Sequence, residues 1–229
     1  MREHFSSSAE DLFNRGAVEN NPQGSWYNRG MKIDKKLQDI TIGLLLGDGC
    51  FEKKKDTIGI RLQIKQRSKA KEYVEWLYGQ FKDYCLSEVK FREDYKQYYF
   101  STRYLREFQD IYSLFYKEGK KVIPSNIKDL LKSPLSLAIW YMDDGSLDYR
   151  PGSHYAFYLA SNCFTVKDSE NLQRVLWENF KIKSAVYNNL CRGKRYPRIY
   201  VGSEGRDAFC RTVQPHILNC FSYKLPNYT

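Results

Sequence analysis

The sequence predicts an α+β protein made of two similar halves, each running helix, strand, strand, helix, strand, strand, helix (αββαββα). Three observations indicate this class. Of the 229 residues, 42% are hydrophobic, which is enough to build a packed core. Asp48-Gly49 and Asp144-Gly145 each follow an apolar run, and the two pairs lie 96 residues apart. The chain after residue 37 divides into two stretches of 96 residues, 38–133 and 134–229, in which similar apolar patterns recur in the same order.

Residues 1–37 read as a leader outside this repeat. They contain the turn-forming segments Asn20–Ser25 and Asn28–Gly30, without a sustained apolar period. We expect a partly disordered arm with one helical turn near residues 10–13.

In the first half, the apolar run ending at Asp48 predicts a helix, and a strand is clearest at 59–67. There Ile60, Leu62 and Ile64 alternate with polar residues, which is typical of a half-buried strand. The pattern then predicts a helix at 69–83, strands within 87–103 and a helix at 104–116.

The second half repeats this order. We expect a helix over 134–144, a strand around 155–163, a helix at 167–180, a hairpin at 186–201 and a helix at 203–214. Leu77 and Phe81 in the first half correspond to Leu176 and Phe180 in the second, at a constant offset of 99 residues. A duplicated fold is the simplest explanation.

Composition excludes several functional classes. No apolar run approaches the ~18 residues of a membrane span, and the N-terminus lacks the apolar stretch of a signal peptide. The 6 cysteines include no Cys-x-x-Cys pair, so we expect reduced thiols in an intracellular protein, in a prokaryotic cytoplasm or an organelle matrix. Only 3 histidines are present, which leaves little material for histidine-based catalysis.

The net charge of +10 favours a polyanionic partner, although charge alone is equally consistent with a basic protein that binds nothing. Basic residues exceed acidic ones by 5 in residues 38–133 and by 4 in 134–229. The polar face of the strand at 59–67 contains Arg61, Gln63, Lys65 and Arg67, the residue types that read guanine and adenine edges in the major groove. A DNA-facing sheet is favoured over a solvated one in the first half, and the two interpretations are balanced in the second. The other candidates for DNA contact are Lys90, Arg92, Gln97, Tyr99, Arg103, Asn162, Arg192, Lys194, Arg195, Arg198 and Tyr200.

The aspartates at the two helix ends are unusual, because the C-terminus of a helix carries partial negative charge and prefers a cation. Gly49 and Gly145 fit the left-handed position that ends many helices. Two such ends brought together would concentrate carboxylates and carbonyls, and a hard divalent cation such as Mg²⁺ would neutralise them. Gly43 and Gly47 lie on one helical face and permit close approach of a second helix, to which Ala138 also contributes a small side chain. Because Ile139 occupies the place of Gly43, this helix seam must be asymmetric.

The segments 41–49 and 137–145 resemble the two copies of the motif that names the LAGLIDADG homing endonucleases. The first matches at its Gly-Leu pair and final Asp-Gly, and the second at Leu-Ala and Asp-Asp-Gly. The phrases Lys120–Asn126 and Tyr223–Asn227 are also similar to the single-chain, two-motif, intron-encoded branch. The resemblance covers residues 38–229.

The resemblance implies a monomer that acts as a pseudo-dimer, with two motif helices at a pseudo-twofold axis and a curved antiparallel sheet from each half in the major groove. It implies cleavage of both strands of a long asymmetric site to leave 3′ overhangs, with Mg²⁺, or Mn²⁺ in its place. Asp48 and Asp144 would bind the metal together with the carbonyls of Gly47 and Asp143, and Lys121 and Lys224 would each place an ammonium near a cleavage site.

Alternatives remain at each level. Asp143 competes with Asp144 as the metal ligand, and we favour Asp144 because it directly precedes glycine, as Asp48 does. Lys120 competes with Lys121, which we favour because it directly precedes Val-Ile-Pro. An RNA maturase that helps its host intron to fold is the second functional hypothesis. A DNA-binding regulator on a nuclease-derived fold is the third; loss of an acid would be its signature, and neither Asp48 nor Asp144 is lost.

Overall fold

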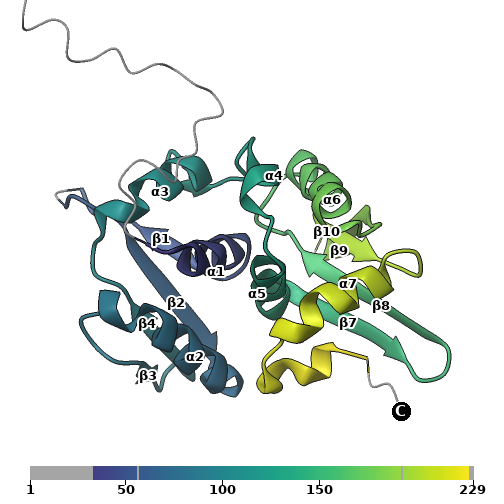
Figure 1. Cartoon of the computed structure of the whole chain (residues 1–229), viewed down its shortest axis with the longest axis horizontal. Coiled ribbons are helices and arrows are strands. Elements are labelled where there is room, and N and C mark those ends of the chain that lie inside the picture. The colour runs from purple at the N-terminus through teal and green to yellow at the C-terminus, as the bar shows by residue number, and fades with distance from the viewer. Residues whose placement is uncertain (1–32, 56, 192, 227–229) are drawn as a thin grey trace, which may run out of the picture. The chain divides into compact units, whose positions relative to one another are not determined.

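The computed structural model describes residues 33–55, 57–191 and 193–226. Within this range the protein has two four-stranded antiparallel sheets, each covered by helices, and one pair of helices between them (Figure 1). The predicted α+β class and the repeated αββαββα order are confirmed. The leader up to residue 32 and its expected helical turn lie outside the described residues.

The first half forms one sheet with the strand order β1-β2-β4-β3. Its elements are α1 (Lys35–Leu46), β1 (Cys50–Glu52), β2 (Arg61–Arg67), α2 (Lys71–Phe81), β3 (Lys90–Arg92), β4 (Gln97–Ser101) and α3 (Gln109–Phe115). Helix α1 therefore begins within the stretch assigned to the leader. Helix α2 packs against β2 and β4 and buries the inner face of the sheet.

The second half repeats this topology with the strand order β7-β8-β10-β9. Its elements are α5 (Pro134–Asp144), β7 (Gly145–Arg150), β8 (His154–Ala160), α6 (Val166–Phe180), β9 (Ala185–Cys191), β10 (Lys194–Val201) and α7 (Arg206–Val213). A short 3₁₀ helix, η6 (Asn219–Lys224), follows near the end of the described chain.

The connection between the halves contains elements that were not expected. Strands β5 (Tyr116–Lys117) and β6 (Lys120–Lys121) form a two-residue-turn hairpin, followed by α4 (Ile127–Leu130). Glu118 and Gly119 both have positive φ, 51° and 75°, as such a turn requires. This hairpin fixes the direction of the Lys121 side chain.

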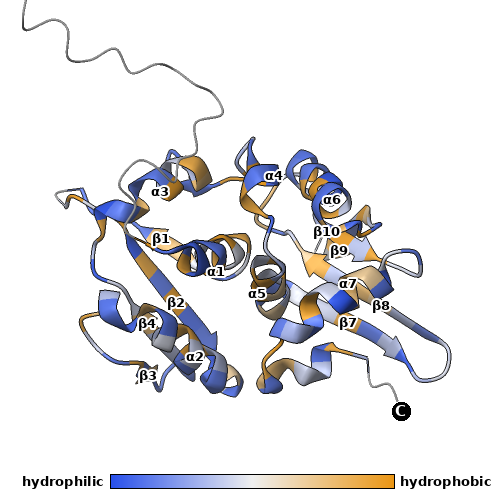
Figure 2. Cartoon of the chain, in the orientation of Figure 1, coloured by the Kyte–Doolittle hydropathy of each residue, from blue (hydrophilic) through white to orange (hydrophobic). Residues whose placement is uncertain are grey.

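Strand pairing defines which residues of the two halves correspond. Cys50, two residues after Asp48, pairs with Gln63, and Ser146, two residues after Asp144, pairs with Tyr158. Gln63 therefore corresponds to Tyr158. Leu62 and Ile64 face the helices in one sheet, as Phe157 and Leu159 do in the other, and all four are buried. Figure 2 shows the alternation of hydrophobic and hydrophilic residues along β2.

The predicted end of the strand around 155–163 is wrong. β8 stops at Ala160, and Asn162 lies in the turn before α6 rather than on a sheet face. The buried Ser161 hydroxyl donates to the Pro197 carbonyl at 3.0 Å, and Thr165 caps α6, so the chain turns away from the sheet at this point.

The two motif helices, α1 and α5, pack side by side at the centre of Figure 1. A Cβ added to Gly43 would lie 2.6 Å from the Ser136 carbonyl oxygen and 2.8 Å from Ile139 Cβ, and one added to Gly47 would lie 2.5 Å from Asp143 Cβ. The close approach of the two helices therefore requires glycine at both positions. Ile139 packs against Gly43, so the seam is asymmetric, as the sequence predicts. Ala138 is buried, but it lies about 100° or more around α5 from each of these contact residues.

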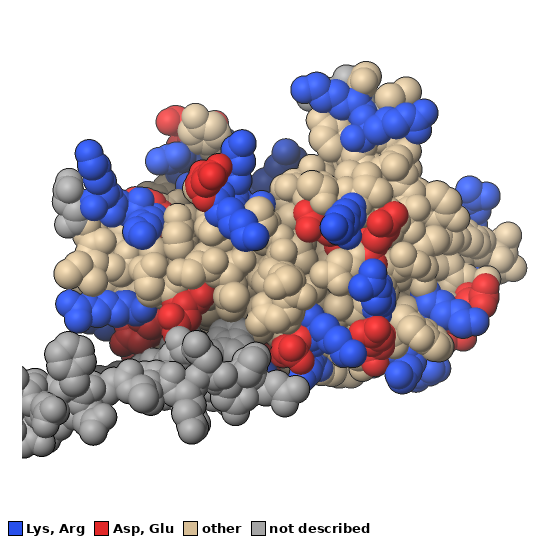
Figure 3. Space-filling model, turned by 90° about the horizontal axis from the view of Figure 1, so that it is seen from above, with Lys and Arg blue, Asp and Glu red and all other residues tan. Residues whose placement is uncertain are grey.

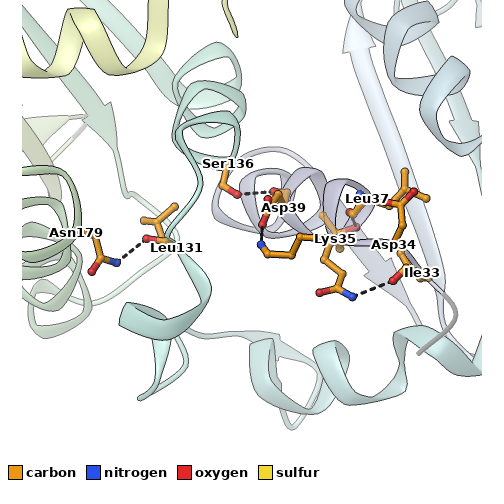
Figure 4. A network of polar contacts seen from close by, with 10 residues as sticks. Ile33, Asp34, Lys35, Leu37, Asp39, Leu131, Ser136 and Asn179 are labelled. Atoms are coloured by element: carbon orange, nitrogen blue, oxygen red, sulfur yellow. Dashed lines mark hydrogen bonds and ion pairs between the residues drawn. The ribbon is translucent and has the colours of Figure 1, made fainter. Parts of the chain in front are cut away.

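Hydrogen bonds hold the other end of this helix pair (Figure 4). The Ser136 hydroxyl donates to the Asp39 carbonyl of α1 at 2.7 Å. Asp34 caps α1 by accepting from the Leu37 amide at 2.8 Å. Asn179 of α6 donates to the Leu131 carbonyl at 2.7 Å and so ties the chain before α5 to the second half.

The prediction that Gly49 and Gly145 adopt a left-handed backbone at the helix ends is wrong. Neither Gly49 nor Gly145 has positive φ, and Gly145 is extended. Their lack of a side chain serves close packing instead, because a Cβ would lie 2.7 Å from Leu44 Cβ at Gly49 and 1.9 Å from the Tyr141 ring at Gly145. Among the described helices, none combines the length and the hydrophobicity that a membrane-spanning segment needs.

Candidate active site

Three carboxylates gather where α1 and α5 end. Asp48 follows the Gly47 that caps α1, while Asp143 and Asp144 are the last two residues of α5. Asp143 Oδ2 accepts a hydrogen bond from the Asp48 amide at 3.1 Å, across 95 residues of sequence. The side chain of Asp143 thus lies in the seam against Gly47.

Gln66, at the end of β2, joins two of these carboxylates. Its Nε2 donates to Asp48 Oδ2 at 2.9 Å and to Asp143 Oδ1 at 3.1 Å. Gln66 was not among the predicted site residues. Its position in the strand could have indicated it, because it is a polar residue in phase with the inward-facing Leu62 and Ile64. The corresponding residue of the second half is Ser161, whose hydroxyl bonds to Pro197, so only the Asp48 side has such a bridge.

The carboxylates are held in an environment that disfavours their charge. Burial raises the pKa of Asp143, and the neighbouring Asp48 charge raises it further. Burial, followed by the Asp48 charge, raises the pKa of Asp144 to about 6, against the opposing effect of Lys121 and Lys224. The cluster therefore carries more negative charge than the protein neutralises.

Each helix end also receives a lysine. Lys121 Nζ donates to the carbonyls of Gly47 at 2.9 Å and Gly49 at 2.8 Å. Lys120, the next residue of β6, is exposed, as alternation along a strand requires. Of the two lysines left open by the sequence, Lys121 is therefore the one at the helix end.

Lys224 takes the same part at α5, with a different set of partners. Its Nζ donates to the carbonyls of Met142 at 2.6 Å and Tyr141 at 3.2 Å. Burial lowers the pKa of Lys224, while Asp143 and Asp144 act to raise it. Both lysines thus place positive charge at the negative end of a helix, beside the carboxylates.

The oxygen atoms at the two helix ends are of the kind that binds a hard divalent cation, but they supply only part of a coordination shell. Asp48 and Asp144 offer carboxylate oxygens, and Gly47 and Asp143 offer main-chain carbonyls, the ligands Mg²⁺ prefers. The Gly47 carbonyl already accepts from Lys121. In the described part of the chain, no three His, Cys, Asp or Glu side chains are arranged to hold a metal by themselves.

A basic pocket of about 800 Å³ opens beside Asp48. Its charged and amide lining comes from β2, the turn after it, the start of β4, η6 and the ends of the two motif helices. These residues are Asp48, Lys65, Gln66, Arg67, Lys69, Gln97, Asp143 and Lys224. Six cationic or amide side chains around a carboxylate pair can hold an anionic phosphate next to the acids.

The predicted DNA-contact residues of the first half mostly share the sheet face opposite the helices. Lys65, Arg67, Lys90 and Arg92 are exposed there, and Gln97 and Tyr99 are half-buried. Arg61 and Gln63 both bond to Glu52, and the Arg61 guanidinium lies 5.1 Å from the Tyr104 ring centre. Arg103 lies beyond β4 and donates to the Asp83 carbonyl at 2.8 Å, so it is held away from the other candidates.

In the second half the candidates divide between the sheet and the tip of its hairpin. Arg198 and Tyr200 lie on the corresponding face of β10, while Lys194 and Arg195 are exposed at the hairpin tip. Arg192, at the turn, lies outside the described residues. Figure 3 shows Lys and Arg side chains gathered on projections along the upper edge of the molecule in that view.

Comparison with known proteins decides the family. The model of the LAGLIDADG DNA endonuclease family matches residues 38–209, which include both Asp-Gly motifs and both sheets. The chain belongs to the LAGLIDADG DNA endonuclease family.

Relatives within this family carry two kinds of name. The chain is 30% identical over 214 residues to the cytochrome b mRNA maturase bI2 of Debaryomyces hansenii, covering 88% of this chain and 78% of that protein. It is 26% identical over 211 residues to the probable intron-encoded endonuclease 1 of Wickerhamomyces canadensis, covering 87% of this chain and 88% of that one. The LAGLIDADG fold is also that of the homing endonuclease I-WcaI bound to its DNA recognition sequence, with a TM-score of 0.74 at 24% identity over 96% of this chain and 98% of that chain.

Proposed function

We propose that this protein is a site-specific homing endonuclease that cuts both strands of a long asymmetric DNA site. The observation that carries the proposal is the electrostatic cluster of Asp48 and Asp144 at the ends of α1 and α5 in a LAGLIDADG protein, where a lysine binds the last carbonyls of each helix. I-WcaI, which shares the fold, binds a DNA recognition sequence. One active site for each DNA strand explains why a single chain contains an aspartate and a lysine at the end of each motif helix.

The chain's own residues supply positioning and charge. The carboxylates of Asp48 and Asp144, with the carbonyls of Gly47 and Asp143, would hold Mg²⁺, or Mn²⁺ in its place. When bound, the ion supplies Lewis-acid stabilisation of the phosphoryl oxygens and a more acidic water. Lys121 and Lys224 offset the charge that builds on the phosphate during hydrolysis. One phosphodiester is hydrolysed in each strand, leaving 3′ overhangs.

The substrate is double-stranded DNA, bound by the monomer as a pseudo-dimer. The outward sheet faces lie in the major groove, where Arg, Lys and Gln side chains read base edges. Because the two halves differ at most of these positions, the recognition sequence is asymmetric. The exposed cations neutralise phosphates, so binding weakens steeply with salt.

RNA maturase activity is a second candidate function. It is favoured by the relative named cytochrome b mRNA maturase bI2, which the chain matches along 88% of its length. The same basic protein surface serves RNA as well as DNA. Assembly of Asp48, Asp144 and both lysines supports retention of nuclease activity, so the two functions are compatible.

Selection of cleaved sites from a randomised duplex library in Mg²⁺ tests the endonuclease directly. The wild type should enrich one long asymmetric sequence, and the Asp48→Asn/Asp144→Asn double variant should enrich none. Failure of the folded wild type to cut any duplex would refute the proposal. A splicing assay of the host intron with the double variant separates the maturase function, since splicing should persist when cleavage is absent.

A further inference from the structure

The outward faces of the two sheets are chemically different, and strand register makes the comparison position by position. On β2 and β3 the outward face carries five cations, Arg61, Lys65, Arg67, Lys90 and Arg92. The counterparts of Arg61, Lys65, Lys90 and Arg92 in the second half are Ala156, Ala160, Tyr187 and Asn189, while β8 ends before the position of Arg67. All four counterparts are neutral, and the cations on the outward face of the second sheet lie elsewhere, at Arg150 on β7 and at Lys194 and Arg198 on β10.

Alanine, tyrosine and asparagine stand at these positions, and two further tyrosines lie beside them. Tyr158 and Tyr200 pair across β8 and β10 with ring centres 5.1 Å apart, and Tyr187 contacts Tyr200 at 5.6 Å. Tyr187 is 51% exposed. Ala160 and Ala185 lie in the same rows, opposite Arg198 and Tyr200. We call Tyr158, Ala160, Ala185, Tyr187 and Tyr200 the tyrosine face.

Arg198, which lies between the residues of the tyrosine face, is already engaged. The Arg198 guanidinium lies 4.4 Å from the Tyr158 ring centre and donates to the Ser146 hydroxyl at 3.1 Å. A guanidinium stacked on a ring and tied to the neighbouring strand has fewer N–H groups left for a guanine edge. Among the described residues, the other cations of this hairpin are Lys194 and Arg195, which are exposed at its tip.

We infer that the two halves read DNA by different chemistry, the first through purine edges and the second through the 5-methyl groups of thymine. In the major groove, thymine presents the one apolar group on a base edge, and apolar side chains such as alanine recognise it. The alanine and tyrosine side chains of the tyrosine face, between which Arg198 is stacked on Tyr158, match that group. This inference rests on the proposed endonuclease function and names the substrate more closely: a site whose half under the second sheet is rich in thymine.

The inference is tested with the site selected from the randomised library, synthesised with deoxyuridine in place of thymidine in one half at a time. Uracil pairs as thymine does but lacks the methyl group. A second selection with Lys65→Ala identifies the half under the first sheet, because base preferences should relax only there. Binding to each duplex is then measured without divalent metal.

Substitution under the tyrosine face should weaken binding about fourfold for each methyl group contacted, and substitution in the other half should change it little. Tyr187→Ser, at an exposed position, should reduce this penalty, while the matched Lys90→Ala should leave it unchanged and lower the salt dependence instead. Equal penalties in both halves, or none, would overturn the inference. Failure to select any cleaved site would refute the endonuclease proposal instead, so the two failures are distinguishable.

Discussion

Asp144 carries an electrostatic penalty that Lys121 and Lys224 offset only in part. Its pKa is raised from 3.8 to about 6, mainly by burial. The folded protein therefore binds this proton more tightly than the unfolded chain, and this contribution to stability is lost as the pH rises from 3.8 to about 6. Above that range the folded metal-free protein holds an unfavourable charge.

Asp144→Asn should therefore stabilise the metal-free protein while removing an active-site acid. At about pH 7 we expect the free energy of unfolding to rise by on the order of 2 kcal/mol, and the gain should vanish below pH 4. Urea denaturation across this pH range measures it, with the exposed Asp94→Asn as control. Mg²⁺ should stabilise the wild type more than the variant. A gain that does not change with pH would contradict the assignment.

Gln66 should act on one strand only, because only the Asp48 side has a bridging amide. Gln66→Ala should slow cleavage of the strand served by Asp48 by about 10- to 100-fold, and nicked plasmid should accumulate. Differential end-labelling of the two strands measures the rates separately. Gln97→Ala, which lines the same pocket without contacting a carboxylate, should affect both strands alike. Equal slowing of both strands by Gln66→Ala would show a merely structural role.

At the residue scale, the sequence predicted the acids and lysines but not their connections. Asp48, Asp144, Lys121 and Lys224 stand beside glycine or proline phrases that repeat along the chain. Gln66 is identified as an active-site candidate only once β2 is placed against the seam, since a polar residue at the end of a strand has many ordinary explanations. The hydrogen bond from Asp48 to Asp143 joins residues 95 positions apart and has no local signature.

At the scale of elements, the seam between α1 and α5 depends on backbone contact. A methyl group at Gly43 would meet the Ser136 carbonyl at 2.6 Å and Ile139 Cβ at 2.8 Å. Gly79 offers a matched comparison within a helix, because it lies in α2 with no heavy atom within 4 Å of an added Cβ.

Gly43→Ala should destabilise the protein by about 1–3 kcal/mol, since the helices must separate to admit the methyl group. Gly79→Ala should stabilise it by about 0.5–1 kcal/mol through helix propensity. Thermal or urea unfolding of the three proteins measures both effects. A neutral Gly43→Ala would mean that the helices are not in backbone contact.

The elements themselves were largely predictable, because apolar periods of 3.6 and 2 residues are long and repeated. Three errors have local physical causes. The hairpin of β5 and β6 has only two residues in each strand, too few to show alternation. Asn162 was placed on a strand that Ser161 ends through its bond to Pro197. Gly49 and Gly145 were assigned a left-handed backbone, whereas their contacts with Leu44 and Tyr141 explain them.

At the scale of the whole molecule, the net charge of +10 is not distributed as two equal DNA-facing surfaces. Each half has a similar excess of basic residues, yet the first sheet carries them on its face and the second carries them at its hairpin tip and elsewhere. The excess of basic residues in each half is visible in the sequence, whereas their different placement on the two sheets depends on the strand register.

The salt dependence of DNA binding should reflect this distribution. Each phosphate-contacting cation that is removed should reduce the slope of log K against log salt by about 1. The Lys65→Ala/Arg67→Ala double variant should therefore lower the slope by about 2, measured by fluorescence anisotropy over a salt series. Tyr158→Phe at the neutral face should leave the slope unchanged. A slope unaffected by loss of both cations would place the phosphate contacts elsewhere.

The central claim is that the acids at the ends of α1 and α5 form two hydrolytic sites, one for each strand. The most direct measurement is conversion of a supercoiled plasmid carrying the selected site in Mg²⁺, compared among the wild type, Asp48→Asn and Asp144→Asn. The wild type should yield linear DNA, and neither single variant should do so. Linear product at the wild-type rate from either variant would contradict the claim.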